Sequence, residues 1–152
     1  LIVIEQKINL EDYIKTGINI DAYVTNQLLI NIFEHNTPLH DGAVIIRGNR
    51  IVSATCYLPL SDNMELSKEL GTRHRAGAGV SEATDAFVII VSEETGKVSV
   101  AHNGELVRNV DGEYLRNKLE LLKIGNLDTG KRIKIWKRGG RSDEEAAIPA
   151  GV

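Results

Sequence analysis

Short runs of apolar, mostly β-branched residues recur along the chain and predict the strands of a β-sheet. Two regions hold a pair of runs around residues that favour a turn, Gly48-Asn49 in the first and Gly96 in the second. Because glycine and asparagine tolerate positive φ, each pair predicts a β-hairpin. The runs lie at 1–4, at 43–58 on both sides of Gly48-Asn49, and at 86–91 and 98–102, and an alternating segment at 132–136 predicts an edge or closing strand.

Two segments show the apolar spacing that is typical of helices. In the segment 24–33 the apolar positions recur every three or four residues, Asp21 or Thr25 is available as N-cap, and Pro38 follows soon after the end. The segment 113–123 has a similar pattern. Helices before, between and after the strands predict an α/β fold with a mixed, largely antiparallel central sheet surrounded by helices.

The organisation of the chain points to a single domain. The chain has 152 residues, and no internal repeat or linker divides its interior, so we predict one domain over residues 1–138. Residues 139–152 are small or charged, show no apolar period and predict a flexible tail. Because the chain begins with Leu1 rather than Met and no signal segment follows, we expect it to be a piece of a longer protein.

Composition narrows the class of protein. Hydrophobic residues make up 42% of the chain and charged residues 26%, which is ordinary globular usage and argues against a disordered, collagen-like or coiled-coil protein. The longest apolar run, 86–91, is far shorter than the roughly 20 residues with which a helix spans a bilayer. The single cysteine, Cys56, cannot form an internal disulfide and favours a reducing, cytoplasmic setting. A net charge of −3 provides no basic field for nucleic acid, so a small phosphorylated ligand fits better.

The first candidate for chemistry is the segment His40-Asp41-Gly42-Ala43, between a helix end and the opening of a strand. The Asp41 carboxylate could accept a proton or hold a divalent cation, His40 offers an imidazole ligand, and Gly42 lets a ligand approach the backbone. Asp-Gly is also a common turn, with the histidine then a surface residue, and on spacing alone that interpretation is the more frequent one.

The second candidate is Gly71-Thr72-Arg73-His74-Arg75, followed by glycines at 77 and 79. Two arginines with a hydroxyl before them and a bending loop after them can surround a polyphosphate with forked donors. The segment lacks the P-loop pattern and the dinucleotide fingerprint, so neither standard nucleotide fold is indicated. A solvated basic turn is the alternative interpretation.

Two further segments suggest a cation and a planar base. In Ser92-Glu93-Glu94-Thr95-Gly96, either carboxylate could join His40 and Asp41 around a hard cation, and Glu94 is the sharper candidate, although a solvated turn is commoner. Tyr57 and Leu58, at the end of a strand, could enclose a planar base, although core packing is the commoner role for such residues. Lone Trp136 is interpreted as a packing residue, and Cys56 has no partner that would make it a nucleophile.

Taken in order, these segments resemble the diadenylate cyclase (DAC, DisA_N-type) domain, which condenses two ATP into cyclic di-AMP, and in particular the membrane-anchored CdaA (DacA) type of Gram-positive bacteria. The resemblance covers roughly residues 1–115, and the DGA and GTRHR motifs are its most specific parts. The matching text is LLINIFEHNTPLHDGAVII at 28–46, CYLPLS at 56–61, SKELGTRHRA at 67–76, VSE at 80–82 and IIVSEETGKVSVA at 89–101.

The resemblance implies an ATP site formed by the DGA and RHR loops, metal-dependent catalysis with Mn²⁺ or Mg²⁺, and a face-to-face homodimer. It implies Asp41, Arg73 and Arg75 as catalytic residues, and His40, Asp41 and Glu94 as metal ligands. The implied ATP-binding residues are Gly42, Ala43, Tyr57, Leu58, Thr72, Arg73, His74, Arg75 and Ser92. After RHR the glycine-rich segment at 77–79 departs from the bulkier residues expected there, and the chain matches weakly beyond Tyr114.

Full-length members of this type carry three N-terminal membrane helices and work beside a membrane regulator and a phosphoglucosamine mutase. The resemblance therefore implies a catalytic domain on the cytoplasmic face of the cell membrane. An alternative is an ATP-sensing regulatory module without catalysis, although the intact HDGA and GTRHR motifs favour an active site. A second alternative, an RNA-binding domain that uses Arg73, Arg75 and Tyr57, is disfavoured by the acidic balance and by an aromatic content of only 5%.

Overall fold

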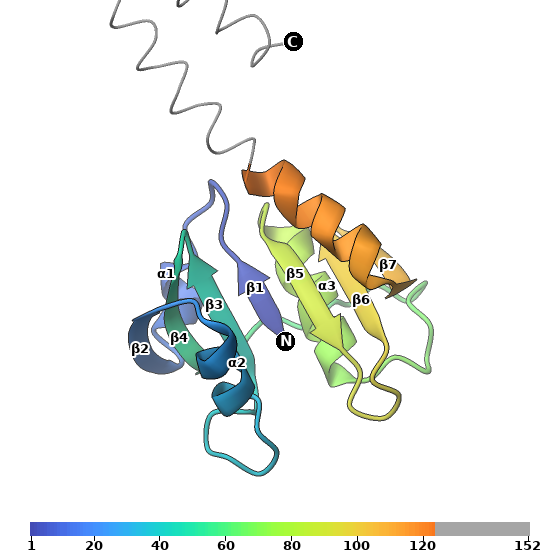
Figure 1. Ribbon diagram of the computed structural model, residues 1–152. Coiled ribbons are helices and arrows are strands. Elements are labelled where there is room, and N and C mark those ends of the chain that lie inside the picture. The colour runs from blue at the N-terminus through green and yellow to red at the C-terminus, as the bar shows by residue number, and fades with distance from the viewer. Residues whose placement is uncertain (124–152) are drawn as a thin grey trace, which may run out of the picture. The chain divides into compact units, whose positions relative to one another are not determined.

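The computed structural model describes residues 1–123, which form two compact units, the first spanning Leu1–Val110 and the second beginning at Asp111. The first unit is built on a seven-stranded sheet in the order β2-β4-β3-β1-β5-β6-β7 (Figure 1). The strands are β1 (Ile2–Ile4), β2 (Ile18–Tyr23), β3 (Ala43–Arg47), β4 (Arg50–Cys56), β5 (Phe87–Val91), β6 (Val98–His102) and β7 (Glu105–Val110), and the helices are α1 (Glu11–Ile14), α2 (Asn26–Ile32) and α3 (Thr72–Ala83). Among the strand pairs within residues 1–123, only β1–β3 is parallel, which confirms the predicted mixed, largely antiparallel sheet.

Several elements form where the sequence predicts them. The first strand and both hairpins are confirmed, with β3 and β4 joined at the positive-φ Gly48, and with Gly96 at positive φ between β5 and β6. The predicted helix at 24–33 is α2, and its N-cap is Thr25, whose Oγ1 accepts a hydrogen bond from the Leu28 amide at 3.1 Å. The second unit contains a helix over 112–123, in agreement with the prediction for 113–123. The predicted strand at 132–136 with Trp136 and the predicted tail at 139–152 lie outside the described residues.

Alternation along the central strands builds two separate cores. Successive side chains of a strand point to opposite faces, so Val3 and Ile45 pack into one cluster while Val44 and Ile46 pack into the other. α3 covers the first face through Ala76 and Val80, and α2 covers the second through Ile32 (Figure 1). Both faces of the short β1 strand are therefore enclosed.

Two glycines allow α3 to lie unusually close to its neighbours. A Cβ atom on Gly77 would come within 2.8 Å of Ile90 Cγ1 on β5, and one on Gly79 would overlap the Pro59 carbonyl and come within 2.9 Å of the Ser61 amide. The Ser61 amide donates to the carbonyl of Arg75 at 2.9 Å, so the segment after β4 is tied directly to this helix. The glycines at 77 and 79 are thus packing residues inside a helix, not parts of a loop.

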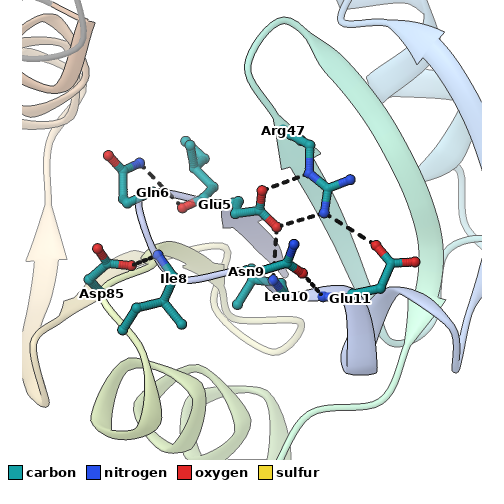
Figure 2. Close-up of polar contacts among 9 residues, drawn as sticks. Glu5, Gln6, Ile8, Asn9, Leu10, Glu11, Arg47 and Asp85 are labelled. Carbon is teal, nitrogen blue, oxygen red and sulfur yellow. Dashed lines mark hydrogen bonds and ion pairs between the residues drawn. The ribbon is translucent and has the colours of Figure 1, made fainter. Parts of the chain in front are cut away.

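A buried carboxylate fixes the connection between β1 and α1 (Figure 2). Glu5, whose side chain is only 9% exposed, accepts hydrogen bonds from Arg47 Nε at 2.6 Å and from the Leu10 amide at 2.9 Å. Burial alone raises the pKa of Glu5, but these hydrogen bonds outweigh it and hold the pKa below its usual value. Asp85 accepts from the amides of Lys7 and Ile8, both at 3.0 Å, and so joins the same connection to the segment between α3 and β5.

We predict that Gly79→Ala lowers the free energy of unfolding by about 1–3 kcal/mol, because the added methyl group has backbone atoms in its way and the helix must shift. Urea denaturation measures the change. Gly112→Ala is the matched control, since within residues 1–123 no atom beyond the neighbouring residues and the helix's own backbone lies within 4 Å of the place that its added methyl group would take, and alanine favours the helix that begins there. Equal stabilities of the Gly79→Ala variant and the unsubstituted protein would contradict the close approach.

Candidate functional site

A cleft of about 900 Å³ opens in the first unit where several segments meet. They include the turn before β3 with Asp41 and Gly42, the end of β4 with Tyr57, the first turn of α3, and the β5–β6 hairpin with Ser92. The cleft thus brings together motifs that lie far apart in the sequence. Its volume falls in the range of small-molecule sites, which is about 300–1,000 Å³.

The turn that carries Asp41 is shaped by the glycine that follows it. Gly42 has a φ of +75°, and a Cβ there would lie 2.9 Å from the backbone carbon of Thr55, so only glycine suits this position. Asp41 Oδ1 accepts a hydrogen bond from the Gly42 amide at 2.9 Å. The Asp41 side chain nevertheless remains 83% exposed and lines the cleft. A fixed backbone therefore presents an accessible carboxylate.

Arg73 links the turn to the opposite wall. Its Nη2 lies 3.4 Å from Asp41 Oδ1, and its Nη1 forms an ion pair with Glu93 Oε2 in the β5–β6 hairpin. The Arg73 side chain is only 21% exposed, whereas the side chains of both acidic residues are largely exposed. One cation thus holds two carboxylates from different segments at the same point of the cleft.

The segment Gly71–Arg75 was predicted to be a loop, and this prediction is wrong. Gly71 is the N-cap of α3, and the residues from Thr72 onward are helical. Arginine and alanine favour a helix, and the close packing at residues 77 and 79 compensates for the low helical propensity of glycine. No side chain of the described part of the chain caps the start of α3, and Gly71, Thr72 and Arg73 line the cleft. The positive end of the helix dipole and its amide groups therefore face the cleft, an arrangement suited to an anion.

His74 lines the cleft but is itself buried, with 9% of its surface exposed. Its Nε2 lies 3.4 Å from the Ser99 hydroxyl on β6. Burial, reinforced by the positive charge of Arg108, lowers the pKa of His74 below its ordinary value. The ring is therefore neutral at pH 7 and joins α3 to the sheet.

Most, but not all, of the predicted site residues line the cleft. Those that do are Asp41, Gly42, Tyr57, Leu58, Thr72, Arg73, His74, Ser92 and Glu94. Three others do not: Ala43 is fully buried in the core, Arg75 lies outside the lining, and the His40 ring lies 2.6 Å from the carbonyl of Thr37 through its Nδ1 atom. The structure thus brings the DGA and GTRHR motifs together at the cleft, although Ala43 and Arg75 within them do not line it.

The cleft also contains three charged residues that the sequence analysis did not single out, Glu69, Lys97 and Arg108. Lys97 and Arg108 join Arg73 as cations, and Glu69 and Glu93 join Asp41 and Glu94 as carboxylates. The Glu93-Glu94 pair was visible in the sequence, but only the structure distinguishes the glutamate that binds Arg73. Arg108 lies on β7, a strand that the sequence analysis did not predict.

The predicted metal ligands do not form a preformed centre. Within residues 1–123, no three side chains of the histidine, cysteine or acidic type lie close enough together to hold a metal ion. Asp41 and Glu94 nevertheless both line the cleft. Mg²⁺ is usually bound by one or two carboxylates together with phosphate oxygens, so these side chains fit an ion that arrives with a phosphorylated ligand.

Comparison with known proteins shows the family to which this chain belongs. The family described as "DisA bacterial checkpoint controller nucleotide-binding" (DAC) matches residues 1–106. The chain belongs to the DAC family. The cyclic di-AMP synthase CdaA of Bacillus subtilis is 54% identical over 138 residues, which cover 90% of this chain and 50% of that protein.

Solved structures agree with the fold of this DAC domain. DacA from Staphylococcus aureus, a N166C/T172C double mutant, has 52% identity and a TM-score of 0.76, with 78% of this chain and 79% of that chain covered. A hypothetical membrane spanning protein from Bacillus cereus has 49% identity and a TM-score of 0.69, with 72% and 54% covered. The chain spans about half the length of CdaA. No helix within residues 1–123 is long and apolar enough to cross a membrane.

We predict that His74 makes the stability of this DAC domain depend on pH. The pKa of the folded His74 is lower than that of the unfolded residue, which is about 6.5, so the unfolded state binds more protons as the pH falls below that value. The free energy of unfolding should therefore decrease from neutral pH downward through this range. Urea denaturation across it should show a shallower decrease for His74→Gln, whereas identical slopes would contradict the assignment.

Proposed function

We propose that this chain is the catalytic domain of a diadenylate cyclase, which converts two ATP into cyclic di-AMP and two pyrophosphates. The observation that carries the proposal is the convergence of the Asp41 carboxylate, the Arg73 guanidinium and the start of α3 in a nucleotide-sized cleft. The cyclic di-AMP synthase named among the relatives supports the same reaction. The DGA and GTRHR motifs of the sequence imply the same reaction.

The cleft offers different surroundings to the two ends of ATP. We assign the phosphates to the uncapped start of α3, with Thr72 and Arg73 as donors and with Lys97 and Arg108 adding positive charge. Tyr57 and Leu58 supply an apolar wall for the adenine. A triphosphate would replace Glu93 on Arg73, because a phosphate group is also an anionic acceptor for the guanidinium fork.

Each condensation joins a ribose 3′-oxygen to the α-phosphorus of the other ATP and breaks the bond from that phosphorus to pyrophosphate. The exposed Asp41 carboxylate is positioned to take the proton of the hydroxyl. Arg73 offsets the charge that develops on the phosphates and on the departing pyrophosphate. Asp41 and Glu94, together with His40, the residue before Asp41, would hold Mn²⁺ or Mg²⁺, which when bound lowers the pKa of the attacking hydroxyl.

The reaction requires two clefts that face each other. If each subunit holds one ATP, the attacking hydroxyl comes from the nucleotide of the other subunit, so we propose a symmetric homodimer. The name of the Bacillus cereus relative, a membrane spanning protein, supports a membrane-anchored full-length protein. The position of this domain on the cytoplasmic face stays a prediction from the family resemblance. The membrane regulator and the phosphoglucosamine mutase stay predictions from the family resemblance.

We predict that Asp41→Asn and Arg73→Ala each lower cyclic di-AMP production by about 100-fold or more, since each removes a group that acts on the reacting atoms. Mass spectrometry of the product formed from ATP with Mn²⁺ or Mg²⁺ measures this loss, and circular dichroism checks the fold. Arg50→Ala is the matched control, because Arg50 pairs with Asp21 outside the cleft. The RHR motif predicts a loss of activity for Arg75→Ala as well, although Arg75 does not line the cleft, and unchanged activity would remove it from the catalytic residues.

The same assay separates the proposal from its alternative. Full turnover by Asp41→Asn would remove Asp41 from the reaction. ATP binding by the unsubstituted dimer without any product would instead support an ATP-sensing module.

A further inference from the structure

The end of β4 is held by a turn from a different part of the chain. Thr55 has a φ of +54°, which is unusual for a β-branched residue, and it lies in an irregular part of the β3–β4 pairing. β4 ends one residue later, at Cys56. The amide of the next residue, Tyr57, donates to the Thr16 hydroxyl at 2.9 Å. The backbone of Tyr57 is therefore fixed from the turn between α1 and β2.

Thr16 is itself well fixed. Its hydroxyl donates to the Tyr13 carbonyl of α1 at 2.6 Å, so the oxygen that accepts from Tyr57 cannot rotate freely. The backbone of the adjacent Gly17 packs so closely against β4 that a Cβ atom on it would lie 2.5 Å from Cys56 Sγ. On the same strand, the Ser53 hydroxyl lies 3.1 Å from the carbonyl oxygens of both Ile14 and Ile18. The turn at 14–18 is thus attached to β4 at several points.

Tyr57 needs such support because its side chain has little of its own. The residue is 75% exposed although it lines the cleft. Few packing contacts therefore restrict the ring, and its direction depends on the backbone that carries it. That backbone lies beyond the end of the strand, where the Thr16 hydroxyl is the partner of the Tyr57 amide.

We infer that Thr16 is a positioning residue that holds Tyr57 in place as the wall of the base-binding part of the cleft. The inference rests on the proposed function, in which Tyr57 contacts the adenine. Thr16 would then contribute to the recognition of the base and not to that of the triphosphate, because the start of α3 is held by other contacts.

The test compares Thr16→Val, which keeps the shape and removes the hydroxyl, with Thr16→Ser, which keeps the hydroxyl. The probe is 3′-deoxy-ATP, which lacks the attacking hydroxyl and cannot cyclise, and its dissociation constant is measured by calorimetry. We expect Thr16→Val to weaken the binding of 3′-deoxy-ATP by about three- to tenfold, the effect of one hydrogen bond. Thr16→Ser, which keeps the hydroxyl, should bind as tightly as the unsubstituted protein. Thr16→Ala, which also lacks the hydroxyl, should behave like Thr16→Val.

Two further measurements exclude a merely structural effect. In a Tyr57→Ala background, Thr16→Val should leave the affinity for 3′-deoxy-ATP unchanged, because the ring that it positions is absent. The affinity for inorganic tripolyphosphate, which has no base, should also be unchanged by Thr16→Val. Equal affinities of Thr16→Val and the unsubstituted protein for 3′-deoxy-ATP would overturn the inference, as would the same loss in the Tyr57→Ala background or a parallel loss for tripolyphosphate.

Failure of the inference differs visibly from failure of the proposed function. If the unsubstituted protein makes no cyclic di-AMP or binds no 3′-deoxy-ATP, the proposed function fails. If it does both and the Thr16 variants bind alike, only the positioning role fails.

Discussion

The position of Arg73 depends on how closely α3 lies against the sheet. Gly77 and Gly79 have no side chain of their own at the contacts with Ile90 and Pro59, so the helix lies close to both, and its first turn lines the cleft. From there the guanidinium reaches Asp41, which is 32 residues away in the sequence, and Glu93 in the β5–β6 hairpin. A packing constraint in the middle of a helix thus determines the geometry of a site at its end. It also explains why glycines occur where a helix would ordinarily avoid them.

The charges of the cleft suit a ligand that carries both signs. Arg73, Lys97 and Arg108 face four carboxylates, so the cleft has no large excess of positive charge. A bare triphosphate would meet the carboxylates as well as the cations, whereas a triphosphate with a divalent ion can satisfy both. In the structure, Glu93 forms an ion pair with the guanidinium of Arg73, which we assign to the phosphates. The ion pair with Glu93 thus neutralises the arginine that we assign to the phosphates.

Much of the fold was predictable because local signals and tertiary structure agree. Gly48-Asn49 and Gly96 mark the two predicted hairpins, and Thr25 caps the predicted helix α2. β7 was missed although Asn103 and Gly104, both at positive φ, form the turn that leads into it. β2 was missed although its apolar and polar residues alternate, and the β-bulge around Asp21, which has a φ of 49°, is visible only in the structure. The start of α3 was predicted to be a loop because the glycines that follow it have a low helical propensity, and their close packing against Ile90 and Pro59 is not visible in the sequence.

The motifs of the site were predictable as a pair, but not the direction of each side chain. Asp41 and Arg73 contact each other in the cleft. Ala43 is instead buried in the core as part of strand β3, and Arg75 does not line the cleft. Spacing in a sequence does not show which carboxylate of Glu93-Glu94 will meet the arginine, because that depends on the twist of a hairpin. Thr16 carries no local signal at all, since its partner Tyr57 is 41 residues away.

A crystal structure of the domain with 3′-deoxy-ATP tests the central claim most directly. The account predicts phosphate oxygens at the start of α3 and on Arg73, with the adenine against Tyr57 and the guanidinium released from Glu93. Phosphates bound away from α3, with Arg73 still paired to Glu93, would contradict it.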